Sequence, residues 1–405
     1  MSIPPLLKQA LTLTLIWRIC LFCLALSASF FFKYAPTFPY SAELLRTGLE
    51  PWLFSWANFD GVHYLRIITK GYESATLIQA FFPAFPLVIK LLLVVLQIKV
   101  SQLTVIIAAL LVNFGLVSAL LVLLFMLVQI DYSETVARNS LVVLLLFPTS
   151  FFLAAVYSEA LFLFVVLGAF LAVRTERWWW ALPLIAIASA TRVVGVLLLP
   201  ALLVELWLQA TKSHTLIDVL RRATHWQQDL QHLLSKYWKP ILGITLASVT
   251  GIGAYMLYLQ QTFGDPLFFY HVQAEFGGGR QESLILYPQV LWRSIKILLN
   301  SDLNIRYFTS VLEFLAGAVG LVGLLLALKK VRLSYVVFSL AAFIVPTLTG
   351  TFSSMPRYIL ICFALLIWVA LQLEHYPRLK IPIAIISGIV LSVSTILFIQ
   401  GYWVA

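Results

Sequence analysis

Apolar segments long enough to cross a lipid bilayer recur along the chain from Leu11 almost to Ala405. Each helical crossing needs about 20 mainly apolar residues, so such segments account for most of a chain of 405 residues. Charged side chains make up only 11% of the sequence and hydrophobic ones 61%, which leaves too little polar surface for water-soluble domains. The sequence therefore predicts an all-α, polytopic membrane helix bundle that forms one domain over residues 1–405.

The first apolar run, 10–32, follows Lys8 and could be taken for the core of a signal peptide. No small-residue cleavage site interrupts this run, and more hydrophobic segments follow it. We interpret it as a retained first helix.

Basic residues gather in the short segments between the apolar runs, which explains the formal net charge of +10. Cytoplasmic loops of membrane proteins carry an excess of Lys and Arg, so the charge does not indicate a nucleic-acid partner. The clusters at 174–177, 212–239, 329–332 and 378–380 therefore mark the cytoplasmic side.

Working outward from these clusters, we predict about eleven crossings and an outer C-terminus. We expect 80–98, which contains two prolines and a lysine, to lie along the membrane or dip into it, because a crossing there would place Arg138 outside. The inner assignment of 129–139 goes against its composition, since Asp131 and a second acidic residue outnumber Arg138, but acidic residues count little in this bias. The predicted spans lie near 10–32, 103–128, 140–157, 158–173, 178–190, 193–208, 240–260, 309–328, 333–350, 358–373 and 381–400.

Four segments lie outside these spans. We expect an outer loop at 33–79, followed by the juxtamembrane segment 80–98, and a second long outer loop at 261–308. Connections this long are usually functional or carry short helices of their own. The inner segment 209–239 has the pattern of an amphipathic helix on the membrane surface.

The informative residues in so apolar a chain are ionisable groups beside or within spans, because burying one without a partner is costly. Asp60 lies among aromatic and apolar residues in Trp-Ala-Asn-Phe-Asp-Gly-Val-His-Tyr, 56–64. Such a setting raises the pKa of a carboxylate unless a cation lies close, and it suits a general base. The alternative is that Asp60 caps a short helix over 61–68, with His63 beside it as a hydrogen-bond partner or a solvated histidine.

Three further charged residues lie at outer ends of predicted spans. Glu159 is at the tip of an outer hairpin, where it is either solvated or engaged in hydrogen bonds. Arg192 and Arg357 lie where a guanidinium fork could hold a lipid phosphate, with snorkelling to the interface as the alternative. Asp60 and these three residues project to the same side, which random placement would not produce.

Several short blocks appear in a fixed order: Asn-Phe-Asp-Gly-Val-His-Tyr (58–64) with Gly71-Tyr72, Phe-Phe-Pro-Ala-Phe-Pro (81–86), 147–152 through 157–159, Ala-Thr-Arg-Val-Val-Gly (190–195), Phe-Gly-Asp-Pro-Leu (263–267) with Gln273, and Ser-Met-Pro-Arg-Tyr (354–358). Together they resemble the signatures of the PIG-V mannosyltransferases, a family that adds the second mannose to glycosylphosphatidylinositol and has many bacterial relatives. Two positions depart from the pattern, because Phe59 stands where Trp is common and Glu275-Phe276 replaces an ending that is often Trp.

The resemblance implies an integral-membrane glycosyltransferase of type GT-C, which uses lipid-phosphate sugars and an acidic residue in the first outer loop. It makes Asp60 the catalytic base, within a catalytic loop at 33–79, and it makes Arg192 and Arg357 candidate ligands of the donor phosphate. No metal and no cofactor are predicted. Substrate binding is further assigned to His63, Tyr64, Glu159, Asp265, Gln273 and Tyr358.

We therefore expect inverting transfer of a hexose, most simply mannose, from a polyprenyl- or dolichyl-phosphate donor to a glycolipid or protein acceptor. The reaction is expected on the non-cytoplasmic face of the membrane, where the protein is surrounded by membrane lipids. No Gly-rich phosphate loop follows a strand, in keeping with a donor delivered within the membrane. A secondary transporter or lipid flippase is the alternative, but such proteins place ionisable residues near mid-span. A scaffold subunit would need no catalytic carboxylate. Compact loops and the absence of N-glycosylation triplets from the outer segments favour a bacterial inner membrane over the endoplasmic reticulum.

Overall fold

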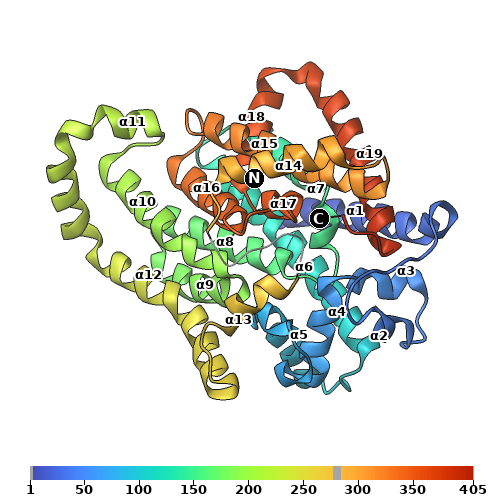
Figure 1. The fold of residues 1–405 in the computed structure, drawn as a ribbon. Helices are drawn as coiled ribbons and strands as arrows, with labels where there is room; N and C mark the ends of the chain where they lie inside the picture. Colours follow the sequence, from blue (N-terminus) through green and yellow to red (C-terminus); the bar gives the residue numbers. More distant parts are fainter. Residues whose placement is uncertain (1–2, 277–283, 405) are drawn as a thin grey trace.

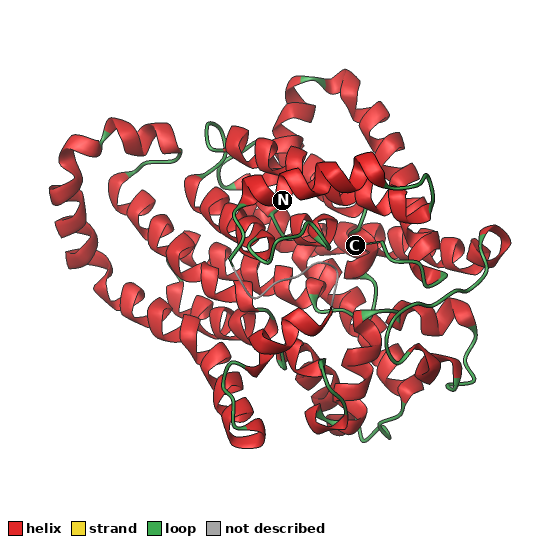
Figure 2. Ribbon diagram, in the orientation of Figure 1, coloured by secondary structure: helices red, strands yellow, loops and turns green. Residues whose placement is uncertain are grey.

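The computed structural model describes residues 3–276 and 284–404, and every regular element in these ranges is a helix (Figures 1 and 2). The first half contains α1 (Ile3–Phe31), α2 (Ser41–Leu45), α3 (Pro51–Phe54), α4 (Asp60–Lys70), α5 (Ala84–Val95), α6 (Gln102–Gln129), α7 (Glu134–Leu145), α8 (Glu159–Arg174), α9 (Trp178–Thr191) and α10 (Leu198–Thr211). The second half contains α11 (Leu216–Arg221), α12 (Trp226–Phe263), α13 (Phe268–His271), α14 (Tyr287–Asn300), α15 (Ile305–Ala327), α16 (Leu333–Thr347), α17 (Met355–Leu360), α18 (Phe363–His375) and α19 (Lys380–Ile399). Short 3-10 helices connect them: η1 (Ser55–Ala57), η2 (Tyr72–Ser74), η3 (Ile78–Ala80), η4 (Ser150–Leu153), η5 (Val193–Leu197), η6 (Ala223–His225), η7 (Val272–Phe276) and η8 (Pro377–Leu379).

Within the described ranges, six helices are long and apolar enough to cross a membrane. They cover Pro5–Phe31, Gln102–Gln129, Val193–Thr211, Ala223–Phe263, Ile305–Ala327 and Pro377–Ile399. Helices α5, α9, α16 and α18 are apolar but shorter. The prediction of an all-α, polytopic membrane bundle is confirmed. The number of eleven crossings and the boundaries of the outer and inner segments stay predictions, since several predicted spans are shorter than a straight bilayer crossing.

One predicted span is not helical throughout. A crossing was expected at 140–157 with an exposed turn at 157–159, but α7 ends at Leu145 and the chain continues through η4 to the start of α8. Pro148 disfavours helix for the residue before it, and residues 149–160 are buried. The expected outer hairpin tip is therefore an internal segment that carries Glu159 into the protein.

Helix α9 lies between α8 and α12 and packs against both of them. The approach of α9 to α12 is so close that a Cβ atom at Gly251 would lie 2.0 Å from the carbonyl oxygen of Ala186. Small residues permit such contacts between membrane helices, where lipid supplies no hydrophobic force for association. This packing holds the end of α9, and with it Arg192, beside the start of α8.

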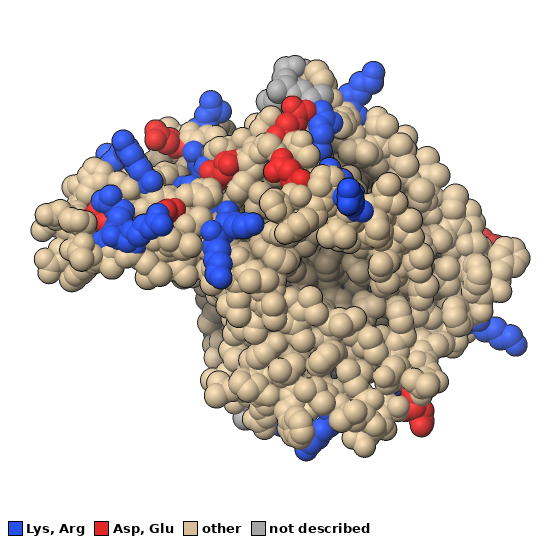
Figure 3. Space-filling view, turned by 90° about the horizontal axis from the view of Figure 1, so that it is seen from above, with Lys and Arg blue, Asp and Glu red and all other residues tan. Residues whose placement is uncertain are grey.

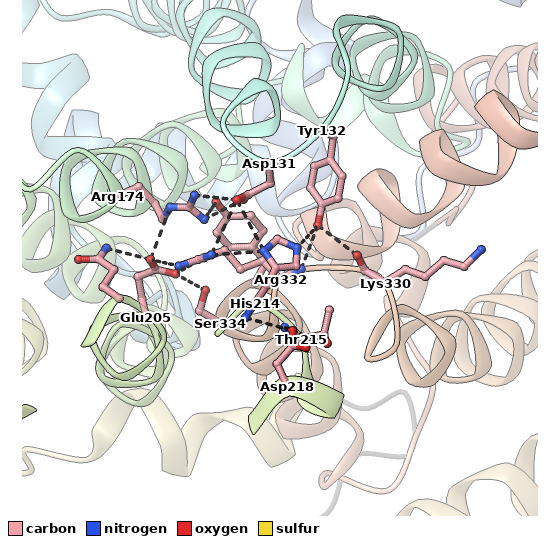
Figure 4. A network of polar contacts seen from close by, with 12 residues as sticks. Asp131, Tyr132, Arg174, Glu205, His214, Thr215, Asp218, Lys330, Arg332 and Ser334 are labelled. Carbon is pink, nitrogen blue, oxygen red and sulfur yellow. Dashed lines mark hydrogen bonds and ion pairs between the residues drawn. The ribbon is translucent and has the colours of Figure 1, made fainter. Parts of the chain in front are cut away.

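Four charged side chains, three from the ends of α6, α8 and α16 and one from the middle of α10, form a buried network, here called the inner network (Figure 4). Arg174 donates hydrogen bonds of 2.7 and 2.8 Å to the two carboxylate oxygens of Asp131. Arg332 donates hydrogen bonds of 2.7 and 2.8 Å to the two carboxylate oxygens of Glu205. Glu205 has no exposed surface, and these paired hydrogen bonds compensate for its removal from water.

The inner network bears on the side assignment of 129–139. Asp131 counted against an inner position for this segment, yet it is paired with Arg174 and lies 3.7 Å from Arg332. Both arginines belong to basic clusters that define the inner side. The segment therefore lies on the same side of the protein as those clusters, as the topology requires.

The inner segment 209–239 forms α11, η6 and the first part of α12. Figure 1 shows it as an arm that extends away from the bundle, and Figure 3 shows Lys and Arg side chains along the same arm. Helix α11 buries none of its residues, and a hydrogen bond of 2.7 Å from Arg222 to Asp229 links the helix end to α12.

Replacing Arg332 with Met should destabilise the protein by about 3–5 kcal/mol, because the charge of Glu205 would stay buried without its main partner. Thermal unfolding in detergent would show this as a lower Tm. The exposed Arg177 belongs to the same basic side, so Arg177→Met is the control and should leave the Tm nearly unchanged. An Arg332→Met variant as stable as the wild type would contradict a structural role for the inner network.

Candidate active site

A strained turn places Asp60 at the start of α4. The preceding Phe59 has a φ of +55°, a conformation that costs a non-glycine residue about 1–3 kcal/mol and persists where the surroundings enforce it. The Phe59 ring packs against Phe38 and Trp403, with centroid distances of 4.6 and 5.2 Å. This packing fixes the turn, and Asp60 becomes the first residue of the helix.

The carboxylate of Asp60 lies against Arg357. Its Oδ2 atom is 2.5 Å from Nη1 of the arginine, whereas the N-cap of α4 is Phe59. The backbone N–H of Asp60 donates a hydrogen bond of 3.1 Å to the hydroxyl of Tyr157. The interpretation of Asp60 as a helix cap is therefore wrong, and Arg357 supplies the cation that its apolar surroundings require.

Arg357 also contacts a second carboxylate, and this extends the pair into a chain of alternating charges. Nε of Arg357 lies 3.0 Å from Oε1 of Glu159, as an ion pair rather than a directed hydrogen bond. The same oxygen accepts a hydrogen bond of 2.5 Å from Nη1 of Arg192. We call Asp60, Arg357, Glu159 and Arg192 the outer network. Its two carboxylates and two guanidinium groups balance in charge.

Burial makes this balance necessary. Glu159 is 1% exposed and Arg357 8%, so neither the solvated interpretation of Glu159 nor simple snorkelling of Arg357 applies. Burial by itself lowers the pKa of Arg357, but the carboxylates of Asp60 and Glu159 outweigh this effect and raise the pKa above its ordinary value. Arg357 is therefore a permanent cation in the site.

Aromatic rings surround the two guanidinium groups. The Cζ atom of Arg357 lies 5.5 Å from the ring centroids of Phe152 and Tyr157 and 5.9 Å from that of Tyr358. Tyr358 is also 5.6 Å from Cζ of Arg192. Such contacts are favourable electrostatically and exclude water, so they keep both arginines in place beside the carboxylates.

One family model matches more than half of the chain. Residues 7–260 match the family model described as mannosyltransferase (PIG-V). The chain belongs to the PIG-V mannosyltransferase family. Within the outer network, Asp60, Glu159 and Arg192 fall in the matched region and Arg357 lies beyond it.

Two solved structures of oligosaccharyltransferases from Archaeoglobus fulgidus show a more distant similarity. One is a complex with Zn and sulfate, and the other is AglB with an inhibitory peptide and a dolichol-phosphate. Their sequence identities are 10% and 12%, with TM-scores of 0.45 and 0.44, over 96% and 97% of this chain and 53% and 56% of those chains. The chain thus spans about half the length of these structures. A comparison with curated proteins gave no match.

His63 and Tyr64, predicted to bind substrate in this PIG-V family member, lie on α4 after Asp60. His63 is 3% exposed and stacks on Phe81 at a centroid distance of 4.8 Å. Burial lowers its pKa to about 4, which keeps the imidazole neutral at physiological pH. The hydroxyl of Tyr64 donates a hydrogen bond of 3.0 Å to Ser158, the residue before Glu159. Substrate contacts of both residues stay predictions.

Asp265 and Gln273 lie in another part of the structure, at the end of α12 and in η7. Asp265 is 2.7 Å from Nδ1 of His271 and accepts a hydrogen bond from the backbone of Leu267. The hydrogen bond with His271 lowers the pKa of Asp265. Gln273 donates to the carbonyl oxygen of Phe269. The structure thus brings four predicted residues into the outer network, with Tyr358 against it, and holds Asp265 in a separate local contact.

Other polar residues support the site, and the sequence interpretation gave them no role. The hydroxyl of Tyr157 donates a hydrogen bond of 3.0 Å to the carbonyl oxygen of Asn58, while Asn113 donates to the carbonyl oxygens of Ala155 and Tyr157 at 2.6 and 3.2 Å. Arg18, inside the first predicted span, donates to carbonyl oxygens of the same buried segment and of α6. An arginine and an asparagine inside apolar runs were the signals that could have identified Arg18 and Asn113. In the part of the chain that the structure describes, no group of three or more His, Cys, Asp or Glu is arranged to hold a metal ion.

The lowered pKa of His63 makes stability depend on pH. The unfolded chain protonates this histidine below about pH 6.5 and the folded protein only near pH 4, so folding loses up to roughly 3 kcal/mol as the pH falls between these values. His63→Phe keeps the aromatic stacking and should reduce the drop in Tm between pH 7 and pH 5. The exposed His225 provides the control, because His225→Phe should retain the wild-type drop. An unchanged drop in His63→Phe would show that other groups cause the acid sensitivity.

Proposed function

We propose that this glycosyltransferase moves a hexose, most simply mannose, from a polyprenyl- or dolichyl-phosphate carrier to a hydroxyl group of a glycolipid or protein acceptor, with inversion at the anomeric carbon. The outer network carries this proposal, because it joins a candidate base, Asp60, to two candidate phosphate ligands, Arg357 and Arg192. The family supports a mannose donor. We propose the outer face of a bacterial inner membrane as the location, with the endoplasmic reticulum as the eukaryotic equivalent.

Asp60 acts as the general base in this proposal. The acceptor oxygen forms a bond to the anomeric carbon while the bond from that carbon to the phosphate oxygen breaks. The lipid phosphate leaves with the electron pair, and the acceptor hydroxyl gives its proton to the carboxylate of Asp60. General bases contribute about 10²–10⁴-fold to such reactions.

The two arginines stabilise the charge that develops on the leaving phosphate. Attack in line with the leaving group places the base and the phosphate on opposite sides of the anomeric carbon. Arg192 suits the phosphate side, because Glu159 and Arg357 separate it from Asp60. Arg357 lies between the two sides, so it both positions Asp60 and offers a guanidinium group to the phosphate. Glu159 holds the two arginines together.

The position of the outer network supports an enzyme over the transporter alternative. Asp60 and Glu159 are the first residues of α4 and α8, and Arg192 follows the last residue of α9. Ionisable residues of transporters lie near the midplane, often where spanning helices are interrupted. The outer network instead lies at the outer ends of the predicted spans, at the opposite end of α8 from the inner network.

Asp60→Asn should lower kcat by about 10²–10⁴-fold, because the amide retains the size of the side chain but cannot accept the proton. The assay measures transfer of radiolabelled mannose from its polyprenyl phosphate to a membrane lipid extract. Glu73→Gln, at an exposed position of the same loop, is the matched control and should retain activity. Near-normal turnover of a folded Asp60→Asn enzyme would remove Asp60 from the catalytic role.

Arg192→Lys and Arg357→Lys should separate phosphate binding from base positioning. Lysine keeps the charge but loses the guanidinium fork, so both variants should raise the KM for the donor by roughly 10–100-fold and leave the KM for the acceptor nearly unchanged. Arg357→Lys should also lower kcat, because its contact orients Asp60. Donor kinetics that stay normal in both variants, with changes confined to the acceptor, would place the phosphate elsewhere.

A further inference from the structure

A long apolar groove lies between α7, α18 and α19, with a volume of about 740 Å³. Its floor contains the buried Leu365 and Leu366 of α18, and exposed residues such as Val142 of α7 and Ile385 of α19 form its rims. Asn139 and Lys380 lie at one end of the groove. The groove therefore offers a continuous apolar surface that opens on the side of the bundle.

The groove exists because the two halves of α19 pack differently. The second half is buried at Leu391 and over 394–399 and packs with α1 and η4. The first half diverges from α18 (Figure 1), and Ile381, Ile385 and Ile386 are 72%, 56% and 62% exposed. Viewed from above, the molecule is hollowed in a largely uncharged area of this face (Figure 3). Side chains of α18 and α19 do not fill the space between these two helices.

The other end of the groove lies near the outer network. Phe147 and Pro148 line this end. The next residue, Thr149, donates a hydrogen bond of 2.8 Å from its hydroxyl to the carbonyl oxygen of Pro356, which directly precedes Arg357. The hydrogen bond between Thr149 and Pro356 thus brings the end of the groove close to the residue that carries the guanidinium group.

We propose that this groove binds the first isoprene units of the donor lipid, while its phosphate lies at Arg357 and Arg192. This inference rests on the proposed function. A lipid phosphate held at the outer network must extend its chain along the protein into the membrane, and one end of the groove, whose lining is mainly apolar, lies near that network. Burial of the chain there adds binding free energy in proportion to the apolar area covered. A phospholipid acyl chain would have no reason to end at the outer network.

The direct test is photocrosslinking with a polyprenyl phosphate that carries a diazirine on an isoprene unit near the phosphate, in nanodiscs of phosphatidylcholine. We expect peptides of α7 and α19 that line the groove to be labelled. Ala384→Trp and Val142→Trp, which fill the groove, should each reduce labelling on the order of tenfold. The matched control is Ile389→Trp on the same helix, because Ile389 is exposed but does not line the groove, and labelling should persist. Melting temperatures near that of the wild type would show that each variant is folded.

Three results would overturn the groove assignment: labels on other helices, equal loss of labelling in Ile389→Trp, or equal labelling by a diazirine phosphatidylcholine, which would identify a bilayer lipid as the occupant.

Steady-state assays provide the second measurement. Ala384→Trp should raise the KM for a mannosyl phosphate with a long polyprenyl chain and change the KM for a two-isoprene analogue much less. Groove labelling by the polyprenyl phosphate without mannose transfer in the wild type would refute the proposed reaction while supporting the lipid site. Mannose transfer whose KM depends neither on the length of the polyprenyl chain nor on Ala384→Trp would refute lipid binding in the groove while supporting the reaction.

Discussion

A charged side chain inside this helix bundle needs polar partners, and in the outer network these partners carry the opposite charge. Removing an ion from water costs several kcal/mol even after the protein relaxes, yet Glu159 and Arg357 are almost fully buried. Their contacts tie the start of α8 and the short helix α17 to Asp60 at the start of α4 and to Arg192 after α9. Asp60 and Arg357 are 297 positions apart in the sequence. The geometry of the site and the packing of these elements therefore rest on the same ion pairs.

Helix α8 connects the outer network to the inner network. Its first residue is Glu159 and its last is Arg174, and the residues between them are almost all buried. A helix of 16 residues is about 24 Å long, whereas the hydrocarbon core of a bilayer is about 30 Å thick. The two networks are therefore closer together than the two surfaces of the membrane. If α8 spans the bilayer, at least one network lies below the membrane surface, a depth that a lipid-linked donor, as proposed, reaches from within the membrane.

Local sequence predicted the helical class and the residues of the outer network, because ionisable groups are so rare in this chain that each one is informative. It could not predict which groups pair. Glu159 was expected at the tip of an outer hairpin, either solvated or engaged in hydrogen bonds, since nothing in the residues around Pro148 indicates that the segment after α7 turns inward. Only the charge of Asp131 could be used for its prediction, because its contacts with Arg174 and Arg332 depend on how three helices pack. The groove beside α19 depends on the divergence of α18 and α19, which no local sequence pattern indicates.

The pairing of Asp60 with Arg357 also shapes the proposed chemistry. Nη1 of Arg357 lies 2.5 Å from the carboxylate of Asp60 and orients this base in the proposed reaction. As the bond to the hexose breaks, negative charge accumulates on the phosphate and competes with Asp60 for Arg357. In the proposed reaction, stabilisation of the leaving group and orientation of the base are thus coupled through one arginine, with Glu159 holding that arginine in place.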